Sequence, residues 1–463
     1  MTKKNLWILT EERPKREVVA TILLEFSKDQ KIPCFIDTIR ILPVLENNKF
    51  SFLYEVVGFR CNKIEKVFIK SVSGYSSFVD FLVFYQNKKP VQADKPLYLI
   101  EETKTDDTES RNTGVYQRAS KFVYAEHYYP KIKKIMLYNL KIKQKEKPTS
   151  TYIFGTRLLK TIGVEIFGKD LDRKLFKPFK TINEIIELKK GMSKAHANNV
   201  PISIEKSKNS IFVSGKLYKS DSLTHDPNIG ALSLISSAIR KLGWKGKIII
   251  KNHGLAQKHL KGDNKFIKIA NILKVEMDGL KLPKSEIIND YWKYEKEGEK
   301  LGTIFIHLVV ENFTKGYSIF ENHGGCEKGY FITKDGDPIP LKKYSDKKAY
   351  KKGNKKKIIA IPDLILIDFG RSEIINIEGK KYKFREQGIK ELKAYKDIEK
   401  LYIEKYYPKF EIIRTVVLYG GEAKKMFKIK IGFLLNENGD LILGVRAPEL
   451  FKEAIKNLLD FWS

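Results

Sequence analysis

The stretches IPDLILIDF (361–369) and EIINIEGKK (373–381) decide the fold that the sequence predicts. Each is a short run rich in Ile and Leu, and turn residues separate the two, as expected for strands buried in a sheet. Further on, residues 389–398 carry apolar side chains every three to four positions, which indicates one face of a helix. This order predicts a mixed α/β fold with helices packed on a central sheet.

The same order of features occurs twice along the chain. In each copy an apolar helix carries a glutamate, an apolar strand carries an aspartate, and a second strand ends in Glu-x-Lys. A helix then leads through Tyr-Tyr-Pro into a buried strand. The features of the earlier copy are Glu25, Asp80, Glu102-Thr103-Lys104 and Tyr-Tyr-Pro at 128–130. Those of the later copy are Glu311, Asp363, Glu378-Gly379-Lys380 and Tyr-Tyr-Pro at 406–408.

The two copies flank a middle region that the sequence predicts to be α+β. A lysine-rich connector at 141–150 leads into it, and a helical stretch at 224–243 lies between strand-like runs. The predicted domains are therefore 1–147, 148–300 and 301–463. A second connector, 342–357, has nine lysines in sixteen residues ahead of Asp363. It is either a solvated loop or a loop that grips phosphate.

An aspartate and a glutamate on neighbouring strands can point at one spot from the same edge of a sheet. Magnesium prefers such hard oxygen ligands, and it lowers the pKa of bound water and offsets charge on a phosphate. A lysine two residues after the glutamate lies on the same face of the strand, where it can stabilise developing charge. A single Asp…Glu-x-Lys pattern can also arise by chance in a basic chain, and its glutamate and lysine then form a solvated pair on a strand. The repetition of the pattern favours a catalytic role for these residues.

These residues resemble the PD-(D/E)XK nuclease superfamily over about 120 residues at each end of the chain. The later copy has Pro362-Asp363, then fifteen residues to Glu378. The earlier copy has Val79 in place of the proline and 22 residues from Asp80 to Glu102. The resemblance implies two PD-(D/E)XK domains with mixed sheets flanked by helices, plus the middle domain. More broadly, the chain resembles type II restriction endonucleases with two diverged catalytic centres.

The resemblance also implies a role for each motif residue. The aspartates and glutamates would bind Mg²⁺, the lysines would assist the attacking water, and the helix glutamates would join the metal ligands. The catalytic residues would be Asp80, Glu102, Lys104, Asp363, Glu378 and Lys380, with Glu25 and Glu311 as further ligands. The product ends would be 5′-phosphate and 3′-hydroxyl. Glu25 and Glu311 can equally be ordinary acids on a helix face.

The charge of the chain favours a polyanionic partner. Lysine and arginine number 87 against 56 acids, a formal net charge of +31. Each neutralised phosphate releases condensed counterions, so such a balance raises affinity for double-stranded DNA. An AT-rich genome also enriches lysine, but glutamate does not balance the excess here. An anionic membrane surface is the main competitor, and no basic amphipathic helix stands out for it.

The polar stretch 105–122 after the first Glu-x-Lys is a candidate for DNA contact. Arg, Asn and Gln read guanine and adenine edges in the major groove. The candidates are Arg111, Asn112, Gln117 and Arg118. The stretch can instead be a polar loop that caps the next helix.

Several classes of protein are disfavoured by the sequence. No GxxxxGK[ST] occurs, so we expect no use of ATP. No run of eighteen uncharged apolar residues occurs and charges come early, so we expect neither a membrane span nor a signal peptide. Cys34, Cys61 and Cys326 are scattered, which suits a reducing cytoplasm and argues against a zinc site or a disulfide framework. The expected localisation is the cytoplasm.

The sequence therefore leads to one expectation and two alternatives. We expect an Mg²⁺-dependent type II restriction endonuclease that cuts each strand of an asymmetric DNA site with one centre. Two different sites in one chain need no dimer, so we expect a monomer, with a DNA methyltransferase as its partner in the system. One alternative is a nicking or repair nuclease with a single active centre and a scaffold copy. The other is a non-catalytic DNA-binding protein.

Overall fold

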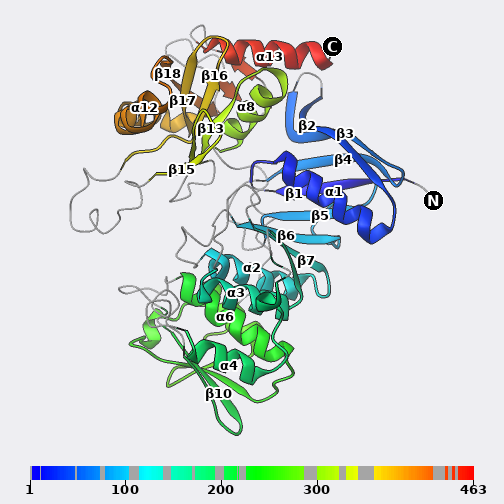
Figure 1. Ribbon diagram of the computed structural model, residues 1–463, viewed down its shortest axis with the longest axis vertical. Helices are drawn as coiled ribbons and strands as arrows, with labels where there is room; N and C mark the ends of the chain where they lie inside the picture. Colours follow the sequence, from blue (N-terminus) through cyan, green and yellow to red (C-terminus); the bar gives the residue numbers. More distant parts are fainter. Residues whose placement is uncertain are drawn as a thin grey trace. The chain divides into compact units, whose positions relative to one another are not determined.

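The structure is a computed structural model of the chain. It describes residues 3–10, 12–46, 49–72, 79–103, 114–138, 148–168, 171, 173–192, 203–215, 217, 226–285, 300–322, 330–341, 359–420, 433–435, 439, 441–443 and 447–462. The chain forms two compact units. Unit 1 is Met1–Gly74, Gln86–Lys89 and Tyr294–Ser463, and unit 2 is Tyr75–Tyr85 and Pro90–Lys293. Both contain mixed sheets flanked by helices, which confirms the predicted fold class (Figure 1).

The N-terminal part of unit 1 is one helix on a set of mixed strands. Its elements are β1 (Lys4–Thr10), α1 (Arg16–Gln30), β2 (Cys34–Glu46), β3 (Lys49–Cys61) and β4 (Ile64–Ser71). The strands pair in the order β2-β3-β4-β1. β1 runs parallel to β4, whereas β2, β3 and β4 are antiparallel neighbours.

The C-terminal part of unit 1 is a second mixed sheet, with the strand order β13-β16-β17-β18-β19-β20 among the described residues. These strands are β13 (Tyr317–Glu321), β16 (Leu364–Asp368), β17 (Glu373–Lys381), β18 (Glu411–Tyr419), β19 (Phe433–Leu435) and β20 (Leu441–Leu443), and a separate pair is β14 (Tyr330–Ile332) with β15 (Pro338–Pro340). The helices are α8 (Lys300–Phe313), α10 (Arg385–Leu392), α11 (Lys396–Ile398), α12 (Glu404–Tyr406) and α13 (Glu449–Trp462). Three short helical turns lie between β17 and α12, namely η5 (Tyr382–Phe384), η6 (Lys393–Tyr395) and η7 (Glu399–Ile403).

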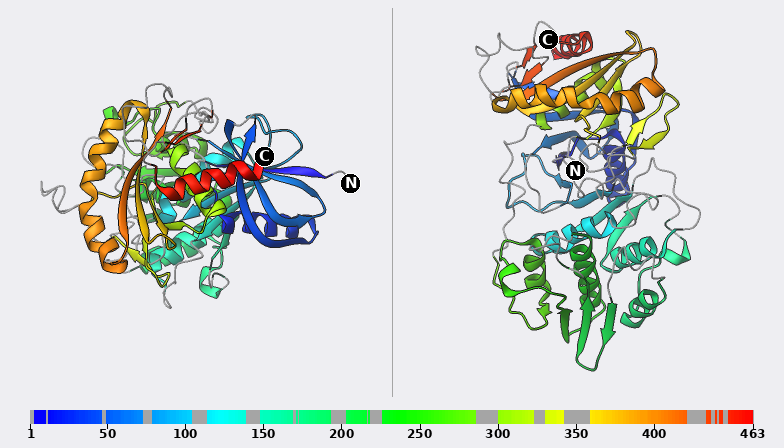
Figure 2. Two further views of the ribbon diagram at one scale, coloured as in Figure 1. Left: turned by 90° about the horizontal axis from the view of Figure 1, so that it is seen from above. Right: turned by 90° about the vertical axis from the view of Figure 1, so that its left-hand side faces the viewer.

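Helices cover both faces of this sheet, which explains its apolar sequence. All of β16 and most of β17 are buried, as is typical of strands covered on both sides. On one face α8 approaches closely, since a Cβ on Gly302 would lie 3.2 Å from Val417. On the other, Gly388 of α10 lies against Lys380, 3.0 Å from such a Cβ. Lys380 therefore faces α10, and Val417 faces α8. In the left view of Figure 2, the orange helical segment α10 to α12 lies on one side of this sheet and the yellow-green α8 lies on the other.

Unit 2 contains two sets of strands, β5-β6-β7-β8 and β12-β11-β10-β9. The strands are β5 (Phe81–Tyr85), β6 (Tyr98–Thr103), β7 (Lys133–Tyr138), β8 (Val164–Phe167), β9 (Ser203–Lys206), β10 (Ser210–Ser214), β11 (Lys247–Lys251) and β12 (Glu276–Met277). The helical elements are α2 (Gly114–Tyr128), α3 (Ser150–Thr161), η1 (Lys174–Phe176), α4 (Ile182–Lys190), α6 (Asp226–Lys241), η2 (Gln257–His259) and α7 (Lys265–Leu273).

The repeated order in the sequence corresponds to a repeated order of strand pairing. β5 is antiparallel to β6, which is parallel to β7, which is parallel to β8. β16, β17, β18 and β19 pair in the same sequence of directions. A helical segment connects the second strand to the third in each set, α2 in one and α10 to α12 in the other. Two copies of one α/β arrangement are therefore present, one in each unit.

The unit boundaries differ from the predicted domains 1–147, 148–300 and 301–463. The middle region is not a unit of its own, because α2 of the earlier copy packs extensively on α6 and also contacts α7. The N-terminal strands belong instead with the C-terminal copy in unit 1, where Phe50 lies against Phe305 with ring centroids 4.5 Å apart. Packing between segments that are far apart in the sequence decides these boundaries. The composition of the linkers does not indicate that packing.

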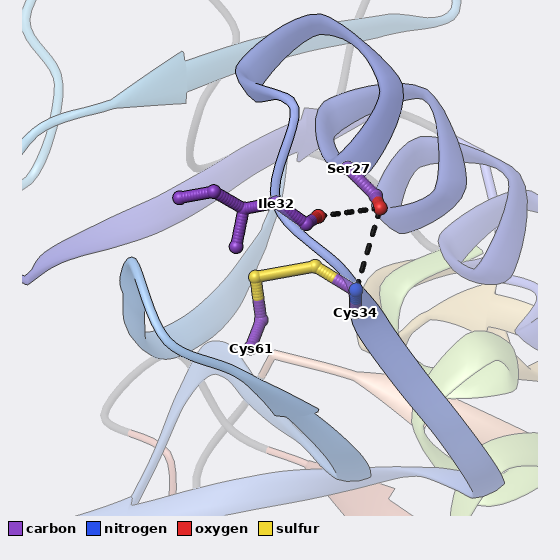
Figure 3. The surroundings of a disulfide bond; sticks show 4 residues. All are labelled: Ser27, Ile32, Cys34 and Cys61. Carbon is purple, nitrogen blue, oxygen red and sulfur yellow. Dashed lines mark hydrogen bonds between the residues drawn. A yellow bond between two sulfur atoms is a disulfide. The ribbon is translucent and has the colours of Figure 1, made fainter.

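A disulfide joins Cys34 of β2 to Cys61 of β3 (Figure 3). The two residues are partners in the antiparallel ladder, with Cα atoms 4.4 Å apart. The Ser27 hydroxyl accepts the Cys34 N–H at 3.3 Å and donates to the Ile32 carbonyl at 2.6 Å, which ties the end of α1 to this strand. The argument from scattered cysteines against a disulfide was therefore wrong, because residues 27 apart become neighbours across one hairpin.

Two observations bear on the compartment. The disulfide removes the cysteine argument for a reducing cytoplasm. Among the helices that the structure describes, none is both long enough and apolar enough to cross a membrane.

The disulfide predicts a specific thiol count. The chain has three cysteines, so protein denatured without reductant should react with about one equivalent of thiol reagent, at Cys326. The bond should stabilise the folded state by about 3 kcal/mol, since it closes a loop of 27 residues in the unfolded chain. Thiol titration, with a denaturation curve of a Cys34→Ser, Cys61→Ser variant beside the parent, tests both. Three reactive thiols would contradict the bond.

Candidate active site

Asp363 and Glu378 lie opposite each other on neighbouring antiparallel strands. Leu364 pairs with Ile377, so Asp363, just ahead of β16, comes opposite Glu378. The Asp363 N–H donates to the Ile377 carbonyl at 3.1 Å, and the Gly379 N–H donates to the Asp363 carboxylate at 2.8 Å. The structure thus brings together the two carboxylates predicted for the later copy.

Lys380 and two helical residues surround the Glu378 carboxylate. Side chains alternate along β17, so Glu378 and Lys380 share the face that α10 covers. The Lys380 ammonium binds Glu378 Oε1, and its second partner is Glu391 of α10 at 2.9 Å. The Tyr395 hydroxyl donates to Glu378 Oε2. Glu378 is 3% exposed, so this carboxylate is held inside the protein with two defined partners.

The electrostatics of this pair suit a bound cation. Burial raises the pKa of Glu378 to about 8, and the charge of Asp363 adds to the effect, against the hydrogen bonds from Lys380 and Tyr395. Burial lowers the pKa of Lys380, but its hydrogen bonds and charge interactions with Glu378 and Glu391 together outweigh this, and the net shift is upward. Glu378 is buried and Asp363 is half-buried, and together with Glu391 these carboxylates carry more negative charge than the Lys380 ammonium that binds Glu378 and Glu391. A divalent cation relieves that excess.

Glu311 does not join this pair. It lies on α8, which covers the opposite face of the sheet, and it bonds to Arg13 at 3.1 Å and to His307 at 3.0 Å. Burial alone would raise the pKa of Glu311, but Arg13 and His307 hold it well below its usual value. Among the described residues, no three Asp, Glu, His or Cys side chains form a group that could hold a metal. The helix glutamate is therefore part of a separate ion cluster.

In the earlier copy the residue beside Asp80 is Glu101 and not Glu102. Phe81 pairs with Ile100, so Asp80 comes opposite Glu101, as Asp363 comes opposite Glu378. The Asp80 N–H donates to Glu101 Oε2 at 3.0 Å, while only the backbone N–H of Glu102 reaches the Asp80 carboxylate, at 2.9 Å. The predicted pairing of Asp80 with Glu102 is corrected by one residue.

That shift changes which residue corresponds to the motif lysine. Two positions after Glu101 stands Thr103, which is fully buried, where the later copy has Lys380. The cations come from α2 instead. Lys121 binds Asp80 at 2.9 Å and Glu101 at 2.9 Å, and Arg118 binds Asp80 at 3.2 Å and Glu101 at 3.0 Å.

The earlier pair is consequently neutralised by the protein itself. Burial would raise the pKa of Asp80, but Lys121 and Arg118 bring it well below its ordinary value. Burial and the charge of Asp80 raise the pKa of Glu101 to about 8. The Lys121 ammonium touches both carboxylates, which is where a shared divalent ion would bind. The residues of this copy therefore fit a metal less well than Asp363 and Glu378 do.

The remaining predicted site residues are Glu25, Lys104, Arg111, Asn112, Gln117 and Arg118. Glu25 is buried on α1 in unit 1, where it pairs with Lys28 at 3.3 Å, whereas Asp80 belongs to unit 2. Three predictions lie outside the described residues, namely Lys104, Arg111 and Asn112. Gln117 lies on α2, but its side chain is also outside the described part, and Arg118 faces the acids rather than serving as a free DNA contact.

The sequence analysis missed four residues of these clusters. Glu101 was hidden because two glutamates adjoin and the Glu-x-Lys pattern selected the second. Lys121 lies one turn after the Gln117–Arg118 pair on α2 and carried no motif. Glu391 and Tyr395 are four residues apart in the helical segment after β17, a spacing that places them on one face and could have been noticed.

Removal of Lys121 should destabilise the protein markedly. In Lys121→Met, Asp80 and Glu101 lose their closest cation inside the protein, and we expect a loss of about 3 kcal/mol of unfolding free energy. Urea denaturation at neutral pH without metal measures it. Lys190→Met is the matched control, because Lys190 pairs with Glu187 at the surface and should cost less than about 1 kcal/mol. Equal effects of the two substitutions would contradict the buried cluster.

Comparison with known proteins yields no family for this chain. No protein-family model, no curated protein and no solved structure matches it.

Proposed function

We propose that this chain is a divalent-metal-dependent DNA endonuclease whose hydrolytic centre is Asp363, Glu378 and Lys380. One observation carries the proposal. A buried carboxylate, Glu378, lies opposite the half-buried Asp363 on the adjacent strand, with a lysine two residues further on the same face. For the aspartate, glutamate and lysine this is the arrangement that the resemblance to the PD-(D/E)XK superfamily implies, whereas Glu311 pairs with Arg13 and His307 on the other face of the sheet.

Asp363 and Glu378 would hold the Mg²⁺. When bound, the ion supplies Lewis acidity to the phosphate and lowers the pKa of a water molecule. The orientation of Glu378 is fixed by Tyr395, whose hydroxyl binds Oε2. Lys380, whose ammonium binds Glu378, would contribute positive charge beside the attacked phosphate. Glu391 holds that ammonium from the helix side.

Double-stranded DNA is the substrate that the charge of the chain favours. A formal net charge of +31 attracts a polyanion through counterion release. The restriction context implied by the resemblance, with a partner DNA methyltransferase and a monomeric nuclease, is part of the proposal. Cleavage would leave a 5′-phosphate.

We further propose that the earlier copy, with Asp80 and Glu101, is a scaffold and not a second cutting centre. Lys121 and Arg118 already neutralise its carboxylates, and Thr103 stands where the later copy has its lysine. The second candidate is an enzyme with two cutting centres, one for each strand. The equal register of the two Asp–Glu pairs favours it.

Loss of the Glu378 charge should abolish cleavage. Glu378→Gln keeps the shape but removes a metal-binding carboxylate, so we expect a fall of at least about 100-fold in rate. The assay is cleavage of a mixture of plasmids and phage genomes with Mg²⁺, so that a rare target site is represented, with EDTA as the metal-free arm. Glu411→Gln on neighbouring β18 is the control, because Glu411 is exposed, and it should cut like the parent. Intact DNA with the parent would instead indicate a DNA-binding protein.

The role of the earlier copy is decided by Glu101→Gln. If that copy is a scaffold, the variant yields the same products as the parent, although its stability can change. If it is a cutting centre, the variant converts linear products into nicked circles, and Glu378→Gln nicks the other strand. Strand-specific sequencing of the product ends distinguishes the two outcomes.

A further inference from the structure

Asn322 directly follows β13 and has a buried side chain. Its side chain is 8% exposed, and its Oδ1 accepts no hydrogen bond from the residues that the structure describes. Its backbone N–H donates to the Asp363 carbonyl at 2.7 Å, which fixes it beside Asp363. An unmade hydrogen bond of this kind costs about 1–3 kcal/mol. Such a group calls for an explanation.

The pattern of β13 indicates which face Asn322 occupies. Phe320 belongs to the buried cluster that includes Tyr395, on the face of α10 to α12. Glu321 points the other way, since it binds Arg13 at 2.6 Å and lies 3.7 Å from His307 of α8. Side chains alternate along an extended chain, so Asn322 returns to the face of Phe320.

Asn322, Asp363 and Glu378 therefore occupy one row across three adjacent strands. Glu321 pairs with Leu364, and Leu364 pairs with Ile377. One position further along these antiparallel strands, Asn322 therefore lies opposite Asp363, and Asp363 lies opposite Glu378. Directly opposite residues have Cβ atoms about 5 Å apart. The side chains level with Asn322 in this row are thus two carboxylates, which are acceptors. An additional acceptor among them suits a cation.

We infer that Asn322 Oδ1 is a third, neutral oxygen ligand of the divalent cation held by Asp363 and Glu378. Hard cations take amide carbonyl oxygens together with carboxylates. The inference rests on the proposed function, because it assigns a residue to the same metal site. It adds a strand, β13, to the two that carry the acids. No three acidic side chains are needed for this site, since the third oxygen is neutral.

Metal binding by the full chain tests the inference without any DNA cleavage. Isothermal titration calorimetry with Mn²⁺ is carried out on the parent, Glu378→Gln, Asn322→Leu and Asn322→Asp. The Mn²⁺ event that Glu378→Gln removes defines the site. Asn322→Leu should weaken that event by about 10-fold, whereas Asn322→Asp, which keeps an oxygen there, should bind at least as tightly as the parent.

A thermal melt without metal controls for folding. Leu in place of an orphaned amide should leave the melting temperature unchanged or raised, because an unsatisfied polar group is removed. Unchanged Mn²⁺ affinity in Asn322→Leu, with binding lost in Glu378→Gln, overturns the role of Asn322 alone. Absence of Mn²⁺ binding in the parent, or binding unaffected by Glu378→Gln, overturns the proposed metal centre as well. A lowered melting temperature in Asn322→Leu with weak binding in Asn322→Asp would assign a structural role and overturn the inference.

Discussion

The antiparallel register of β16 against β17 is the constraint on which the candidate site depends. Because Leu364 pairs with Ile377, the residues before and after them, Asp363 and Glu378, come level on one face. A slip by one residue would turn every side chain of β17 to the other face and would bury Glu378 against α8. The Gly379 N–H bond to the Asp363 carboxylate ties the aspartate side chain to the same register. Position on the sheet, more than any single contact, determines which acids can act together.

The two copies show how one backbone arrangement can carry different charge balances. Both place an aspartate opposite a glutamate, and in both burial raises the pKa of the glutamate to about 8. In the earlier copy α2 brings an arginine and a lysine against the pair, so the protein supplies its own cations. In the later copy the strand lysine is shared with Glu391, and a tyrosine supplies a neutral donor. Among the described contacts, the earlier pair thus has two cations against it, whereas the later pair has the Lys380 ammonium at Glu378.

The sequence was sufficient for the parts of this structure that depend on local pattern. The apolar runs predicted the Asp-bearing and Glu-bearing strands, and their repetition predicted two related α/β arrangements. Asp363, Glu378 and Lys380 meet as expected because the later copy has a single glutamate at the end of its strand. Pairing register, however, is a property of two strands together. Neither the choice of Glu101 over Glu102, nor the arrival of Lys121 from α2, nor the Cys34–Cys61 bond can be read from one strand alone. The two compact units differ from the predicted domains for the same reason, since α2 packs on α6 across a long sequence separation.

The C-terminal sheet buries polar side chains at positions where apolar side chains would be more stable. β17 would be more stable as a purely apolar strand, because an isolated buried carboxylate must be compensated by partners and still has a raised pKa. Glu378 nevertheless sits at 3% exposure between apolar neighbours, and the orphaned oxygen of Asn322 lies level with it. Polar residues that are unfavourable in an apolar core are expected at positions where a functional site requires them. Here the conflicting groups are all oxygen acceptors, they converge from three strands, and they lie on one face. A site for a cation accounts for all three features at once, whereas a structural role accounts only for the hydrogen bonds of Glu378.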